Sequence, residues 1–136
     1  MPSPAEFHYN DFLSDSEDLQ IPEGEFVIYG TVYAHPQHAD ALEAIYAYTN
    51  EHAKSEPGTL QYYLVRDADD RNVFHMFEHY ASRAAFDEHN SQPIIQKLIN
   101  EDNYIKGVKA KFFSPCKVAK AVPRGGGGGG GGGVGI

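Results

Sequence analysis

The amino-acid sequence predicts an α+β fold of the ferredoxin-like type, in which a four-stranded antiparallel sheet carries helices on one face. Hydrophobic residues make up 41% of the 136 residues, which is more than a disordered chain carries and indicates a packed core. Segments with strand-like and helix-like patterns follow one another in the order strand, helix, strand, strand, helix, strand. This order is the split β-α-β arrangement.

The first predicted strand spans residues 26–33 (FVIYGTVY), which are rich in β-branched and aromatic side chains. Alternate residues of this segment form two faces, and both faces are largely apolar. We therefore expect a central strand that is covered on both sides.

The first predicted helix runs from Gln37 to about Ser55. Pro36 suits its first turn, and Glu56-Pro57-Gly58 ends it, because the residue before a proline avoids helical backbone and glycine permits a reversal. Core-facing residues recur at intervals of three and four, which predicts an amphipathic helix; they are Ala39, Leu42, Ile45, Tyr46, Thr49 and Ala53.

Two further strands and a helix follow. Residues 59–66 and 73–80 have strand composition and are separated by a polar turn, so we expect a hairpin. Ser82 is a natural N-cap for a second helix that extends from Arg83 to about Asn90.

The last predicted elements are a short helix and a fourth strand. Gln92-Pro93 interrupts the second helix, and the isoleucine and leucine residues at 94–99 suggest a further short helix. Residues 108–113 alternate in polarity, with Lys109 and Lys111 on one face, and predict the fourth strand.

The two ends of the chain differ in composition from the predicted domain at 26–120. Residues 1–25 contain seven acidic residues and no Lys or Arg, which indicates an acidic N-terminal arm. Residues 121–136 include nine consecutive glycines and are expected to form a disordered tail, because glycine loses the most entropy on ordering.

Charge and cysteine content argue against several partners and sites. The net charge is −8 and basic residues are few, so no nucleic-acid partner is expected. No apolar run approaches the roughly 18 residues that span a membrane, so no membrane partner is expected. Cys116 is the single cysteine and the N-terminus lacks the features of a secretory signal, which favours a cytoplasmic protein. No metal site is expected, because His75 and His79 would lie about 13 Å apart along a strand.

One face of the predicted sheet has no helix to cover it, and the acidic arm is too polar to bury it. We therefore expect a homodimer in which two sheets stack face to face.

Three segments at a characteristic spacing resemble a known family. They are residues 26–36, residues 55–62 with Glu56-Pro57-Gly58 and Tyr62, and residues 74–89 with Glu78, Ser82 and His89. Together they resemble the antibiotic biosynthesis monooxygenase (ABM) domain family. The marks of that family are a Glu-Pro-Gly turn into the second strand, an aromatic-Glu-X-Trp-X-Ser strand exit, and a histidine in the second helix.

The resemblance implies a dimeric α+β barrel that oxidises a small phenolic, quinol or anthrone-like molecule with dioxygen and without a bound metal or flavin cofactor. Tyr80 stands where the family usually has tryptophan. The haem-degrading branch relies on that tryptophan, so the departure disfavours haem oxygenation.

One face of the third strand is assigned to a cavity beneath the helices, following the position of the family's tryptophan. His75 and His79 would then lie at the dimer interface or the rim, because side chains alternate along a strand. The residues assigned to the cavity are Phe74, Met76, Glu78 and Tyr80.

Glu78 and His89 are the candidate catalytic bases. A carboxylate on an apolar face needs a partner or a raised pKa, and an imidazole titrates near neutral pH. The structural alternatives are a pairing of Glu78 with Arg66, Arg83 or a backbone donor, and a surface or capping position for His89.

Tyr29 and His52 complete the candidate substrate-binding residues. Tyr29 shares a strand face with Tyr33, and one of the two hydroxyls could point into the cavity; the alternative is core or interface packing. His52 lies late in the first helix and could meet the same cavity.

The sequence is compatible with three functions. The first is the monooxygenase. The second is a non-oxidative cyclase, decarboxylase or carrier for the same ligands. The third is a non-catalytic, stress-related or interaction domain, which a cavity filled by side chains would favour.

Overall fold

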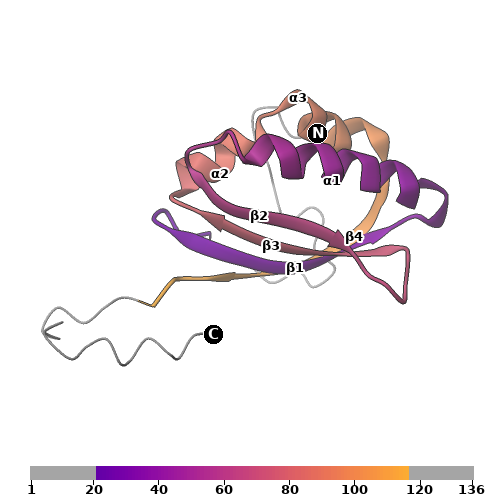
Figure 1. The fold of residues 1–136 in the computed structure, drawn as a ribbon, viewed down its shortest axis with the longest axis horizontal. Coiled ribbons are helices and arrows are strands. Elements are labelled where there is room, and N and C mark those ends of the chain that lie inside the picture. Colours follow the sequence, from indigo (N-terminus) through magenta and orange to yellow (C-terminus); the bar gives the residue numbers. More distant parts are fainter. Residues whose placement is uncertain (1–20, 117–136) are drawn as a thin grey trace, which may run out of the picture.

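The computed structural model describes residues 21–116, which form one sheet with its helices on one side (Figure 1). The predicted order of elements is confirmed. The first 20 residues of the predicted acidic arm and the whole predicted tail lie outside the described residues. The elements are β1 (Phe26–Ala34), the 3-10 helix η2 (Pro36–His38), α1 (Ala39–Ala53), β2 (Thr59–Arg66), β3 (Val73–Tyr80), α2 (Arg83–Asn90), α3 (Pro93–Lys97), the π-helical turn η3 (Leu98–Asp102) and β4 (Ile105–Phe113).

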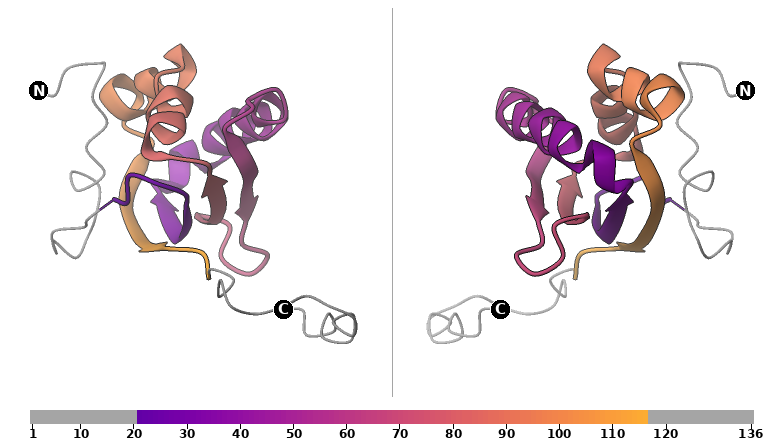
Figure 2. Two further views of the ribbon diagram at one scale, coloured as in Figure 1. Left: turned by 90° about the vertical axis from the view of Figure 1, so that its left-hand side faces the viewer. Right: turned by 90° about the vertical axis from the view of Figure 1, so that its right-hand side faces the viewer.

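The four strands are arranged in the order β2-β3-β1-β4, and all neighbours are antiparallel. Both end views in Figure 2 show the helices on the same face of the sheet. The predicted α+β ferredoxin-like fold is therefore confirmed, with β1 in the interior of the sheet as expected.

Local sequence signals explain most of the boundaries. The Ser82 side chain accepts a hydrogen bond from the Ala85 amide at 3.1 Å, which is the predicted N-cap of α2. β4 begins at Ile105, three residues before the predicted start at Val108. The difference arises because Gly107 and Ile105 pair with the end of β1 across an irregular register, which the lysine-glycine sequence did not indicate.

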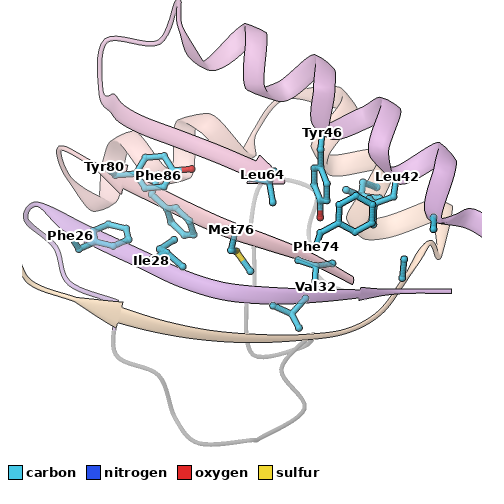
Figure 3. Packing of buried hydrophobic residues seen from close by; sticks show 14 residues of the cluster. Phe26, Ile28, Val32, Leu42, Tyr46, Leu64, Phe74, Met76, Tyr80 and Phe86 are labelled. Atoms are coloured by element: carbon cyan, nitrogen blue, oxygen red, sulfur yellow. The ribbon is translucent and has the colours of Figure 1, made fainter. Parts of the chain in front are cut away.

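The hydrophobic core lies between the helices and one face of the sheet, which we call the inner face (Figure 3). Gly30 lies at the centre of this face. A Cβ atom at this position would lie 2.5 Å from the Lys109 carbonyl oxygen and 2.8 Å from Met76 Cε, so the close approach of β4 requires glycine. The largest fully buried side chains are Tyr80, Phe26, Phe74, Phe86, Ile28, Leu42 and Thr49.

The opposite face of the sheet, the outer face, is uncovered in the single chain. Tyr29 is 54% exposed and Tyr63 is 58% exposed, and the Tyr29 ring packs edge-on against Phe77 at a centroid distance of 4.8 Å. The expectation that β1 is covered on both faces therefore holds for one face within the chain.

The segment at 21–25 lies against the domain. Ile21 packs on the core, the Glu23 carbonyl accepts from the Arg83 amide at 2.9 Å, and Glu25 Oε2 lies 2.6 Å from His79 Nε2. Among residues 21–116, no helix is both long enough and apolar enough to cross a membrane.

Candidate functional site

A cavity of about 70 Å³ lies between the inner face of the sheet and helices α1 and α3. Most of its wall is aliphatic. The polar groups that reach it are few, and they belong to Tyr46, Thr49, Tyr62, Glu78, His89 and Asn90.

Strand β3 presents the predicted face to this side of the sheet. Residues 74, 76, 78 and 80 are buried, whereas 73, 75, 77 and 79 are half-buried on the outer face. Met76 and Glu78 line the cavity, and Phe74 and Tyr80 are buried in the core beside it. The predicted orientation of β3 is confirmed, and the described contacts of His75 and His79 are with Asp67 and Glu25.

Glu78 is a buried carboxyl with a neutral partner. The Tyr80 hydroxyl donates a hydrogen bond to Glu78 Oε1 at 2.6 Å. Burial raises the pKa of Glu78, although the charge of nearby His89 and the Tyr80 hydrogen bond act in the opposite direction. The expected structural pairing with an arginine is wrong, because Arg66 binds Asp40 and Glu43 on the surface. Arg83 likewise binds Asp87.

His89 is buried in α2 with 3% of its surface exposed, so the surface alternative for it is wrong. Its Nδ1 lies 2.7 Å from Glu56 Oε1. Its ring packs against Tyr62 at 4.6 Å and Tyr80 at 5.6 Å between centroids. α2 therefore holds one imidazole in a fixed orientation at the cavity wall.

The Glu56 carboxylate fixes this orientation. It also accepts from the Thr59 hydroxyl at 2.7 Å and from Gln92 Nε2 at 2.9 Å, and it lies 2.6 Å from His52 Nδ1. Burial alone would raise the pKa of Glu56, but the hydrogen bonds from His89, Thr59 and His52 outweigh it and hold that pKa below its usual value. A charged carboxylate beside Nδ1 favours the tautomer in which Nδ1 carries the proton.

This tautomer leaves the other ring nitrogen of His89 with its lone pair. Within residues 21–116, no hydrogen bond engages His89 Nε2. An imidazole with Nδ1 anchored by a carboxylate and Nε2 unengaged at an apolar cavity can, in its neutral form, accept a proton from a bound molecule.

Four of the five predicted substrate-binding residues do not line the cavity. Phe74 and Tyr80 pack in the core beside it, and the other two lie elsewhere. Tyr29 points to the outer face, so the prediction that it lines the cavity is wrong; Phe26, Ile28 and Val32 occupy the inner face, and alternation places Tyr29 opposite. His52 does not line the cavity. Its side chain is 39% exposed and lines a second hollow of about 350 Å³, which Glu56 and His89 also line. Of these three residues, His89 alone borders the first cavity as well.

Sequence reasoning missed three residues of the site. The sequence pattern indicates for Glu56 only a helix-ending turn, although this residue stands in the motif that carries the family resemblance. Tyr46 was assigned to the apolar face of the first helix, and Tyr62 to a strand. Of the part of the chain that is described, no group of three or more His, Cys, Asp or Glu side chains is arranged to hold a metal ion.

Comparison with known proteins identifies the family. The family model for antibiotic biosynthesis monooxygenases matches residues 25–101, more than half of the chain. The chain belongs to this family. The matched segment contains β1 through α3 and most of η3, together with Glu56, Glu78 and His89.

Individual relatives of this ABM chain are distant. It is 27% identical over 86 residues to the uncharacterized protein sll1783 of Synechocystis sp., and this match spans 63% of the chain and 58% of the length of that curated relative. Protein PA3566 of Pseudomonas aeruginosa has a TM-score of 0.61 at 24% identity, covering 72% of this chain and all (100%) of that one. Rv0793 of Mycobacterium tuberculosis has a TM-score of 0.57 at 24% identity, covering 70% and 98%. These two likenesses show a shared fold.

Proposed function

We propose that this protein is a monooxygenase that oxidises a small phenolic, quinol or anthrone-like molecule with dioxygen, with His89 as the general base. One observation carries the proposal: the buried His89 ring has Nδ1 anchored by Glu56 at 2.7 Å and borders an apolar cavity. Family membership adds support, because other members have been described as monooxygenases.

The proposed reaction needs a base and an apolar enclosure. His89 Nε2 takes a proton from the substrate, and the resulting anion is electron-rich enough to give one electron to dioxygen. The substrate radical and superoxide combine through a new carbon–oxygen bond, and loss of water leaves a carbonyl. One oxygen atom ends in the product and the other in water, so a methylene or a quinol is oxidised with no further reductant.

Glu78 suits a complementary part in this reaction. Burial raises its pKa, which favours the protonated form, and a protonated carboxyl can donate a hydrogen bond to a developing negative oxygen. The Tyr80 hydroxyl holds Glu78 Oε1 in place. We therefore assign proton removal to His89, which a carboxylate orients, and hydrogen-bond donation to Glu78, whose burial favours the protonated form. Two titratable groups in such different surroundings take opposite roles in acid–base catalysis.

The homodimer is part of the same proposal. On the outer face, Tyr63 pairs with Phe77 and Phe77 with Tyr29, and the Tyr29 and Phe113 rings lie 6.0 Å apart. An aromatic stripe thus crosses all four strands, and a contiguous exposed apolar patch of this kind favours a protein partner. Stacking of two sheets would cover the stripe on both copies.

Oxygen uptake tests the proposed activity. The protein is mixed with a one-ring quinol or an anthrone under air, and dioxygen consumption is followed with an electrode. We expect His89→Ala to lower the rate by about 10²–10⁴-fold. His75→Ala is the matched control, because His75 also pairs with a carboxylate, at 2.8 Å, but lies outside the cavity.

Two outcomes would contradict the proposal. The first is the absence of oxygen consumption above the uncatalysed rate with either substrate. The second is an equal loss in the His89→Ala and His75→Ala variants. Product formation that continues without dioxygen would instead indicate non-oxidative chemistry in the same cavity.

A further inference from the structure

The Glu56 carboxylate lies between two imidazoles that differ in exposure. Its Oε1 is 2.7 Å from Nδ1 of His89, whose side chain is 2% exposed, and its Oε2 is 2.6 Å from Nδ1 of His52, whose side chain is 39% exposed. We call Glu56 with these two imidazoles the bridge. It connects the imidazole at the cavity with an imidazole that meets solvent in the second hollow.

Packing of the turn after α1 against α2 holds the bridge together. His52 and Glu56 are four residues apart, a spacing that brings side chains together at the end of a helix. A Cβ atom at Gly58 would lie 2.5 Å from Ala85 Cβ, so glycine lets this turn approach α2 closely. This close approach brings Glu56 within hydrogen-bond distance of His89.

We propose that His52 is a positioning residue for His89 and acts through the shared Glu56 carboxylate: a proton bound to His52 weakens the hold of His89 on its own added proton. The inference rests on the proposed function for the role of His89 as the base. It adds that the charge of a solvent-exposed imidazole controls the strength of the base at the cavity.

The physical reason is that one negative charge cannot fully compensate two positive ones. When His89 accepts a proton at Nε2, its ring becomes a cation, and the charge of Glu56 stabilises that cation. If His52 is protonated as well, the two like charges share one carboxylate and each is stabilised less. His52 can take its proton directly from water, and histidine is the side chain that changes charge between about pH 5 and pH 8.

Other titratable groups near the bridge belong to neighbouring elements. On α2, the exposed Glu88 lines the second hollow. On β3, Glu78 interacts with the charge of His89, and the proposed function keeps Glu78 protonated and therefore uncharged. On α1, Glu51 and Lys54 pair with each other at 2.7 Å. The tyrosine rings that contact the two imidazoles are Tyr48, Tyr62 and Tyr80. All of these groups stay in place when His52 alone is replaced.

Histidine NMR tests this coupling without any oxidation. The full chain is labelled with nitrogen-15, and the ring-nitrogen signals of His89 are followed from about pH 8 to about pH 5, the range in which histidine titrates. In the unaltered protein we expect these signals to shift in two steps, one of which has the midpoint of the His52 signals, because interacting groups titrate together. This readout does not depend on a variant that folds.

His52→Gln isolates the charge, because glutamine can donate a hydrogen bond to Glu56 but does not titrate. We expect the shared step to disappear and His89 to bind its proton about three- to tenfold more tightly, since the competing positive charge is gone. His79→Gln is the matched control. His79 Nε2 also lies 2.6 Å from a carboxylate, that of Glu25, but His79 borders neither the cavity nor the second hollow.

Three results would overturn the proposal. They are a single-step titration of His89 in the unaltered protein, an equal effect of His52→Gln and His79→Gln, and loss of the Nδ1 proton of His89 in His52→Gln at about pH 8, which would show that His52 only holds the carboxylate in place. Because no dioxygen is involved, a coupled titration in a protein that consumes no oxygen would support this inference and contradict the proposed activity. Oxygen consumption with an uncoupled His89 would do the reverse.

Discussion

The two faces of β3 place similar side chains in opposite surroundings. Phe74 on the inner face is 1% exposed and packs edge-on against Tyr46 at 5.4 Å, whereas Phe77 on the outer face is half-buried against the exposed Tyr29. One strand therefore serves both as the floor of a closed core and as part of an open aromatic surface.

The imidazole–carboxylate pairs show the same contrast. His89 and Glu56 lie 2.7 Å apart with side chains 2% and 15% exposed, and His75 and Asp67 lie 2.8 Å apart with side chains 36% and 29% exposed. The pairing distance is almost equal in the two. What distinguishes the first pair is enclosure beside a cavity, and this property suits an imidazole to acid–base chemistry on a bound molecule.

The largest expected effect comes from the same substitution on the two faces of β3. Phe74→Ala should lower the free energy of unfolding by about 3–5 kcal/mol, because it leaves a cavity in the closed core. Phe77→Ala should lower it by about 1 kcal/mol in dilute protein, since Phe77 is half-buried. Denaturant unfolding of both variants measures the difference.

Protein concentration sharpens this comparison. If two copies stack through the outer face, the loss caused by Phe77→Ala should grow with protein concentration, as expected for a linked dimer, while the loss caused by Phe74→Ala should not. Sedimentation of the unaltered chain gives the oligomeric state directly. A chain that stays monomeric at all concentrations would contradict the proposed stacking of two sheets, but it would not affect the prediction for Phe74→Ala.

The next largest effect is the pH dependence of stability that Glu78, on the inner face, produces. Because the pKa of Glu78 is raised in the folded state, the folded protein holds this proton more tightly, and stability falls as pH rises above the unfolded value of 4.5. Glu78→Gln keeps an acceptor for the Tyr80 hydroxyl and removes this decline. We expect its Tm to exceed that of the unaltered protein by a few degrees near pH 7 and to match it near pH 4. A Tm that is lower at both pH values would show that the charge is not the dominant property of Glu78.

Local patterns in the sequence determined the elements well. The strands at Thr59–Arg66 and Val73–Tyr80 and the helix at Arg83–Asn90 have the predicted boundaries, because alternation, a polar turn and a serine cap act over a few residues. The buried face of α1 also follows the three- and four-residue spacing.

The site could be predicted only in part, because its geometry depends on contacts distant in sequence. Glu56 and His89 are 33 residues apart, and nothing in either local pattern indicates that one holds the other. Alternation grouped the side chains of β1 but did not determine which group faces the helices, and the prediction for Tyr29 failed for this reason. The β3 residues were assigned to the correct face because the family resemblance supplied that choice.

The smallest expected effect is on the pH dependence of stability, and it comes from Asp67, the carboxylate that pairs with His75. Hydrogen bonds from His75, and from the backbone amides of Asp70 and Asp69, lower the pKa of Asp67 to about 2. A lowered pKa contributes stability that is present above the unfolded value of 3.8 and is lost as pH falls toward about 2. This direction is opposite to that of Glu78.

Asp67→Asn should therefore flatten the decrease in Tm between about pH 4 and pH 2 while changing Tm by only a degree or two at neutral pH, because exposed pairs contribute little. Asparagine keeps an oxygen for the two backbone amides, so the variant isolates the charge. Asp69→Asn, in the same exposed turn, is the control for the loss of one negative charge. Equal dependence of Tm on acid pH in the two variants would show that the net charge of the turn, rather than the contact with His75, governs this part of the pH dependence. The proposed contrast between Glu78 and Asp67 would then be wrong for Asp67.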